Sequence, residues 1–246
     1  MEGQRVNSKI FCKTIILSFL VLFGFSFWGC ITLPKEIYVP LNADVEGLRV
    51  YKKIPVRAAL LISEEDKNYV YKGTPSGFRL SNIVHVFPLG EALEKDSVQI
   101  FSQIFRGVQV VRTPAEAQNF KIVIAPKMED FSFRYDEGGI SFTTTYIIPT
   151  AAIKVKTTVY SAGTRIWERS VKSPEQTKRI AYYAGFTNEN EMGEVASQAL
   201  IYVLKKIAEE LVQDPEVEKN AGSISIDGLT KTYAQQKRRI PLRQSW

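Results

Sequence analysis

The sequence predicts an α+β fold in which two main helices pack on one face of a mostly antiparallel sheet, preceded by a signal or anchor segment. Apolar residues recur every three or four positions over Leu89–Phe105 and again over Met192–Leu211, which is typical of helices with one buried face. Between them, residues 120–171 alternate apolar and polar side chains in several runs, which is typical of strands. Strands grouped between two helices favour an α+β arrangement.

The first 29 residues have the layout of a bacterial secretory signal. A basic start leads into an apolar run over 14–28, and Gly29 places a small residue just before Cys30. We expect cleavage between Gly29 and Cys30 and acylation of the Cys30 thiol, because two or more acyl chains give stable membrane anchoring. The run is shorter than the about 20 residues of a transmembrane helix. An uncleaved helix in the inner membrane is the alternative.

Residues 30–55 are predicted to be a lipidated tether, because three prolines break regular structure there. The folded domain is expected over 56–214. Its first strand, 56–63, is almost continuously apolar, which is typical of a strand buried on both faces. A weaker alternating run over 83–87 precedes the first main helix.

Turn and cap signals divide the rest of the domain. Thr113 before Pro114, with Glu116 three residues after the threonine, predicts the start of a short helix. A turn is expected at Asp136–Gly139 between two strands, and a second turn at Ser161–Thr164. Asp214 followed by proline is expected to end the last helix.

The chain has a formal net charge of +6, but much of the excess lies in the last sixteen residues. Residues 215–246 are therefore predicted to be a basic, flexible tail in which Lys237–Arg239 contact anionic lipid heads or remain solvated. The body of the protein is close to neutral. We expect no nucleic-acid partner, because such a domain concentrates basic and aromatic residues on a folded face.

Few residues are candidates for chemistry. Cys30 is the single cysteine of the mature chain and His85 the single histidine, so neither a metal site nor a cofactor is expected. His85 is interpreted as an exposed or edge-strand side chain. Three carboxylates, Glu129, Asp130 and Asp136, are interpreted as solvated strand ends, with a carboxylate-based hydrolase as the weaker alternative.

Aromatic residues form two candidate contact surfaces. Tyr182, Tyr183 and Phe186 precede the last helix and either contact a partner or fold back on the core. A second set shares one strand face and is expected in the core under the helices, or against an acyl chain if the sheet opens. This second set comprises Phe131, Phe133 and Tyr135.

The layout resembles small bacterial outer-membrane lipoproteins with an α+β domain, such as the YajG-type family, and auxiliary lipoproteins of envelope transport systems. The resemblance depends on Gly29–Cys30, the proline-bearing tether, the apolar strand Ala58–Ile62 and the strands over 121–171. It implies a non-enzymatic envelope protein. Ile31 after the cysteine, where inner-membrane retention would favour Asp, implies the periplasmic face of the outer membrane.

Taken together, the sequence favours a membrane-anchored envelope lipoprotein that acts as a binding or assembly component with an envelope protein partner. A periplasmic carrier of a hydrophobic ligand, held between sheet and helices, is the alternative.

Overall fold

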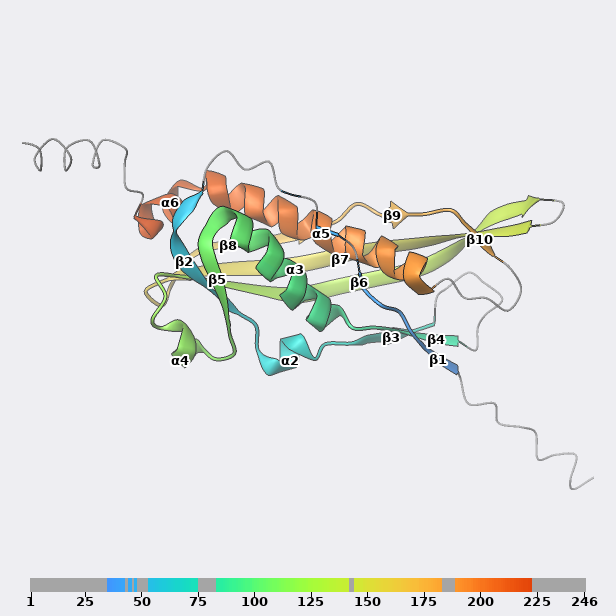
Figure 1. Ribbon diagram of the computed structural model, residues 1–246, viewed down its shortest axis with the longest axis horizontal. Coiled ribbons are helices and arrows are strands. Elements are labelled where there is room, and N and C mark those ends of the chain that lie inside the picture. Colours follow the sequence, from blue (N-terminus) through green and yellow to red (C-terminus); the bar gives the residue numbers. More distant parts are fainter. Residues whose placement is uncertain are drawn as a thin grey trace, which may run out of the picture. The chain divides into compact units, whose positions relative to one another are not determined.

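The computed structural model describes residues 35–42, 44–45, 47, 53–74, 83–141, 144–182 and 189–222. The chain divides into a unit of residues 1–35 and a unit of residues 36–246, and nearly all described residues belong to the second. The predicted α+β class is confirmed: the second unit combines a seven-stranded and a three-stranded sheet with helices (Figure 1).

The described elements follow one another along the chain. They are β1 Lys35–Tyr38, β2 Ile54–Leu61, α2 Glu64–Lys67, β3 Tyr71–Gly73, β4 Ile83–Phe87, α3 Leu89–Ile104, β5 Phe105–Val111, α4 Pro114–Ala117, β6 Ile122–Ser141, β7 Thr144–Ser161, β8 Thr164–Lys172, β9 Gln176–Thr177, β10 Ile180–Tyr182, α5 Glu189–Gln213 and α6 Pro215–Ala221.

The larger sheet has the strand order β10-β7-β6-β2-β5, and β7 also pairs with β8 and β9. Most pairs are antiparallel, but β2 runs parallel to both β5 and β6. Parallel neighbours need crossover connections. One crossover contains α3, and the other contains α4. Successive residues of β2 are buried on opposite faces, Ala58 and Leu60 in the main core and Ala59 in a second apolar cluster, which explains its nearly continuous apolar sequence.

The long β6–β7 hairpin differs from the prediction of a turn at Asp136–Gly139. The strands continue past this point, because Asp136 still pairs with Ile148 and Ser141 pairs with Thr144. The register shifts between Glu137 and Ile140, and Gly139 has a φ of 90°. Glycine accepts this left-handed conformation without steric cost, so the pair of glycines forms a bulge within the hairpin instead of ending it.

Helices α3 and α5 lie side by side on one face of the larger sheet (Figure 1), as the sequence predicts. The helices bury their apolar stripes against the core-facing side chains of β2, β6 and β7. Fully buried members of this core include Leu60, Ile100, Ile124, Val155 and Leu200.

The folded domain begins earlier than predicted. Within the proposed tether, β1 pairs with β4, and the amide of Val39 donates to the carbonyl of Val86 at 2.9 Å. Val39 is fully buried, so this part of 30–55 belongs to the fold. Prolines in the segment interrupt regular structure but do not prevent packing.

The domain also ends later than the predicted boundary at 214. Asp214 caps α6, because its side chain accepts from the amides of Glu216 and Val217. Val217 and Ala221 are buried in the core. The proline that ends α5 therefore starts a further packed helix, as proline commonly does in a first helical turn. Residues 223–246 of the predicted tail lie outside the described residues.

The smaller sheet has the order β1-β4-β3 and packs against the middle of β6. Phe87 lies 4.7 Å from Phe133 and 5.0 Å from Phe131, measured between ring centroids, and Tyr71 lies 4.8 Å from Phe131. The aromatic face of β6 is thus buried in the core, as one of the two interpretations expected. It packs against this second sheet as well as against the helices.

Candidate functional site

The face of the larger sheet opposite α3 and α5 carries a second apolar cluster. Side chains of a strand alternate between faces, so β2 sends Ala58 and Leu60 to the main core and Ala59 to this cluster. Val111 and Val123 join it from the two neighbouring strands. Apolar side chains on both faces of a sheet indicate that another element or another molecule shields each face from water.

Helix α4 covers only part of this cluster. The connection from β5 to β6 crosses β2 on this face, and Ala117 of α4 is buried against it. The helix begins at the predicted cap: Thr113 Oγ1 accepts from the amide of Glu116 at 3.3 Å, and the Glu116 carboxylate accepts from the amide of Arg112 at 3.0 Å. This reciprocal pair fixes the helix at the rim of the uncovered area.

Beside α4 the surface forms an open pocket of about 650 Å³ with mainly apolar walls. Its walls come from β2, α4, the start of β6 and the β7–β8 turn. The lining residues are Leu61, Pro114, Ala117, Gln118, Phe120, Val123, Ala125, Tyr160, Ala162 and Gly163. Partly exposed apolar walls of this kind suit an apolar side chain or chain segment of a ligand. We call this the apolar pocket.

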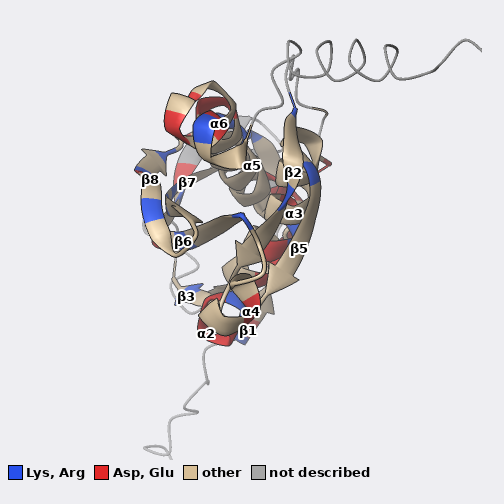
Figure 2. Cartoon of the chain, turned by 90° about the vertical axis from the view of Figure 1, so that its left-hand side faces the viewer, with Lys and Arg blue, Asp and Glu red and all other residues tan. Residues whose placement is uncertain are grey.

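The same sheet face becomes charged next to the pocket. Oε2 of Glu129 lies 2.9 Å from Nζ of Lys154, and Oε1 of Glu168 lies 3.3 Å from Nζ of Lys156. Hydrogen bonds from these two lysines are the main cause that holds the pKa of each glutamate below its ordinary value. Figure 2 shows acidic and basic residues together on β8 and also on α6. The glutamates and lysines beside the apolar pocket therefore form a solvent-exposed surface of paired charges.

The three carboxylates considered for hydrolysis are not brought together. Glu129 pairs with Lys154, whereas Asp136 lies 3.1 Å from Arg134. Asp136 is six residues beyond Asp130 on the same strand, which corresponds to about 20 Å at 3.3 Å per residue. This separation exceeds the about 5–9.5 Å between the carboxylates of glycosidases.

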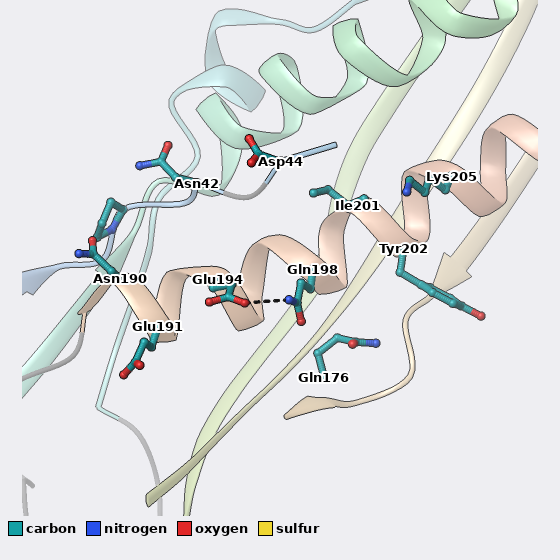
Figure 3. Close-up of a pocket in the computed structure, with 11 residues that line it drawn as sticks. Asn42, Asp44, Gln176, Asn190, Glu191, Glu194, Gln198, Ile201, Tyr202 and Lys205 are labelled. Atoms are coloured by element: carbon teal, nitrogen blue, oxygen red, sulfur yellow. Dashed lines mark hydrogen bonds between the residues drawn. The ribbon is translucent and has the colours of Figure 1, made fainter. Parts of the chain in front are cut away.

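A second, polar pocket of about 740 Å³ lies along α5. Figure 3 shows side chains of α5 facing Asn42 and Asp44 of the N-terminal segment and Gln176 of β9. Its central carboxylate is already paired, because Glu194 accepts from Lys178 Nζ at 2.6 Å and from Gln198 Nε2 at 3.1 Å. A second lining carboxylate is not satisfied in the same way, because among the described residues Glu191 Oε2 is buried without a hydrogen-bond partner.

His85 is buried, so its interpretation as an exposed or edge-strand side chain is wrong. It is 1% exposed and lies on the core-facing side of β4, with Nε2 3.2 Å from the hydroxyl of Tyr135. That hydroxyl also lies 2.6 Å from Met192 Sδ. Burial lowers the pKa of His85, partly opposed by the backbone of Ile83 and the charge of Glu189. The buried imidazole lies between β4 and β6.

Most of the remaining predicted site residues fall outside the residues that the structure describes. Gly29, Cys30, Tyr183 and Phe186 fall outside the described residues. Tyr182 ends β10, where its backbone pairs with Thr145. The predicted partner contact at these aromatics and the lipid attachment at Cys30 therefore stay predictions.

Among the residues that the structure describes, no helix is both long and apolar enough to cross a membrane. Nor do any three His, Cys, Asp or Glu side chains of the described segments lie close enough to one another to hold a metal ion.

The apolar pocket was not among the sites that the sequence predicts. The available signal was the unbroken apolar run over Ala58–Leu61, which predicts burial on both faces, while only one face has a long helix to cover it.

No family model matches the chain, and no curated protein matches it. Among solved structures, it is similar to a Xanthomonas campestris protein of the DUF330 family, at 14% identity over 83% of this chain and 99% of the other, with a TM-score of 0.39. A neuraminyllactose-binding hemagglutinin homolog from Helicobacter pylori matches at 10% identity over 76% and 100%, with a TM-score of 0.39. A minor lipoprotein from Acinetobacter baumannii matches at 13% identity over 69% and 94%, with a TM-score of 0.28.

Proposed function

We propose that the protein is an envelope lipoprotein, cleaved after Gly29 and anchored through acyl chains on Cys30, whose domain binds an envelope protein partner without catalysing a reaction. The observation that carries the proposal is the placement of Gly29–Cys30 directly after a basic start and an apolar run. Ile31 favours the periplasmic face of the outer membrane, by the resemblance to outer-membrane lipoproteins.

The apolar pocket supports a binding role for the domain. Its partly exposed walls are apolar, and the glutamates on the adjoining sheet face are paired with lysines. An apolar centre beside a polar rim is the usual composition of a protein interface. We place the partner's contact here, with an apolar side chain of the partner seated between Phe120 and Tyr160.

The anchor is tested by mass spectrometry of the protein purified from membranes of a bacterium that processes its signal. The expected N-terminal peptide begins at Cys30 and carries the mass of two or three acyl chains. Cys30→Ser should abolish acylation and membrane retention, while Cys12→Ser should change neither. An unmodified N-terminus at any other residue would refute the lipoprotein assignment.

The partner contact is tested by photo-crosslinking in cells. Phe120 is replaced by p-benzoylphenylalanine, and the matched control carries the same group at Tyr202, which is exposed on α5, away from the apolar pocket. We expect one discrete protein adduct from position 120 and none of the same mass from position 202. Ala125→Trp, which fills the pocket, should remove that adduct. Equal adducts from both positions would contradict the proposal.

The apolar pocket also favours a second candidate, a carrier of a hydrophobic ligand. The sequence placed such a ligand between sheet and helices, but that region is filled by fully buried side chains such as Ile100 and Val203. Native mass spectrometry of the acylated protein distinguishes the two functions. A carrier should show a bound lipid mass that Ala125→Trp removes, and a protein-binding domain should show only the mass of the chain with its anchor.

A further inference from the structure

The smaller sheet has one buried and one outward face. Ile37 and Val39 point inward, so Glu36 and Tyr38 share the outward face of β1. On β4, His85 and Phe87 point inward, which leaves the half-buried Val84 and Val86 outward. Beside β3, Tyr71 packs on Phe131, and Val70 and Lys72 occupy the opposite side. We call this surface the outer face; it comprises Glu36, Tyr38, Val70, Lys72, Val84 and Val86.

The outer face exposes apolar side chains. Tyr38 is 57% exposed and Val70 is 42% exposed, and Tyr69 beside it is 40% exposed. The two charges among these six residues neutralise each other, because Lys72 Nζ lies 3.0 Å from Glu36 Oε1 across β4. The surface therefore combines one tyrosine and three valines with no net charge, and the exposed Tyr69 lies beside it.

The chain that leads to this face is short. Lys35, the first residue of β1, is the fifth residue after Cys30, and Tyr38 is the eighth. A fully extended chain spans at most about 3.6 Å per residue. An acylated Cys30 in the bilayer surface therefore holds Lys35 within about 18 Å, and Tyr38 within about 29 Å, of the lipid headgroups.

We propose that the outer face of the smaller sheet rests on the lipid headgroup layer of the membrane that holds Cys30. Tyrosine suits this layer because its ring is apolar and its hydroxyl remains hydrated. The absence of net charge on the six residues of the face indicates apolar and aromatic contact rather than attraction to anionic lipid. The contact is weak by itself, and the anchor makes it intramolecular, which raises its effective concentration. This inference rests on the proposed lipoprotein function.

The test uses the acylated full chain in phosphatidylcholine vesicles. The mature chain has no cysteine besides Cys30, so an introduced thiol takes a single label. Val70→Cys and, as a matched control, Glu209→Cys on the exposed side of α5 are labelled with nitrobenzoxadiazole. Quenching by nitroxide-bearing lipid is then measured. We expect at least threefold stronger quenching at position 70 than at position 209. Adding Tyr38→Asp to the Val70→Cys variant should halve it or more, without changing the unfolding midpoint.

The two hypotheses fail in different ways. Label taken up by the wild-type protein, or an N-terminal peptide without acyl mass, would refute the anchor itself. An acylated protein whose labels at 70 and 209 are quenched equally would leave the anchor intact and overturn the contact of the outer face with the membrane. Unchanged quenching after Tyr38→Asp would also overturn it.

Discussion

Gly193→Ala tests how the N-terminal segment is held to the domain. Gly193 is buried on α5, and the chain at Val39–Pro40 crosses the helix there. A Cβ at position 193 would lie 1.8 Å from the carbonyl oxygen of Pro40 and 3.4 Å from Cγ1 of Val39. Real contacts of this kind need at least about 3 Å between the two atoms, so the crossing backbone must move by more than about 1 Å.

Two opposing effects set the size of the change. Alanine in place of glycine inside a helix stabilises by about 1 kcal/mol. Moving the crossing segment exposes Val39, which is fully buried, at a cost of about 1.5–3 kcal/mol. It also strains the hydrogen bond from the Val39 amide to Val86, which contributes about 0.5–1.5 kcal/mol. The loss of packing and hydrogen bonding exceeds the gain in helix propensity, and we expect a net destabilisation of about 1–3.5 kcal/mol.

Urea unfolding followed by far-ultraviolet circular dichroism measures this difference. The matched control is Gly107→Ala in β5, where the added Cβ would lie 4.0 Å from the nearest atoms of Arg57. The control should change the free energy of unfolding by less than about 0.5 kcal/mol or increase it. If Gly193→Ala proves as stable as the wild type, or about 1 kcal/mol more stable, then the segment does not pack tightly on α5 and the reasoning fails.

Three further predictions concern other buried or capping groups. Burial raises the pKa of Asp96 to about 6, so the native state binds the proton more tightly than the unfolded chain does. The free energy of unfolding should therefore fall as pH rises from about 4 to 6. Asp96→Asn should flatten that slope and stabilise the protein at pH 7.5 by up to about 3 kcal/mol, measured by urea unfolding. The pKa of His85 is lowered by burial, so the free energy of unfolding should fall as pH drops below 6.5. The free energy of unfolding is measured over a pH series for the wild type and for His85→Leu. An equally steep loss of stability in the variant would contradict this prediction. Thr113→Ala removes the cap of α4 and should lower the free energy of unfolding by about 1 kcal/mol in thermal unfolding. Binding of an apolar dye at the apolar pocket should rise at the same time. Unchanged dye binding would argue against α4 as a wall of the pocket.

Local sequence signals were enough for the helices and the strand faces. The apolar stripes of α3 and α5 follow the helical period, which predicts one buried face on each helix. The cap at Thr113 is also local, because its partners lie three residues away. By contrast, the bulge at Gly139 and a turn look alike in sequence, since both need glycine with a positive φ. The pairing partner across the hairpin, not the local sequence, decides between them.

Non-local contacts account for what the sequence did not predict. His85 is buried because β4 packs on β6, fifty residues away, where the hydroxyl of Tyr135 lies beside its Nε2. The apolar pocket depends on the crossover of α4 on the face opposite the long helices. An alternating strand pattern shows which residues share a face but not which element covers that face.

Strand β6 connects the two surfaces proposed to bind. Val123 lines the apolar pocket near its start, and Phe133 packs against the smaller sheet ten residues later. At 3.3 Å per residue, these positions are about 33 Å apart along the strand. The long hairpin therefore lets one end of the domain rest on lipid while the other receives a protein partner. Removing the anchor should then weaken membrane retention while leaving the crosslink from Phe120 intact with a purified partner.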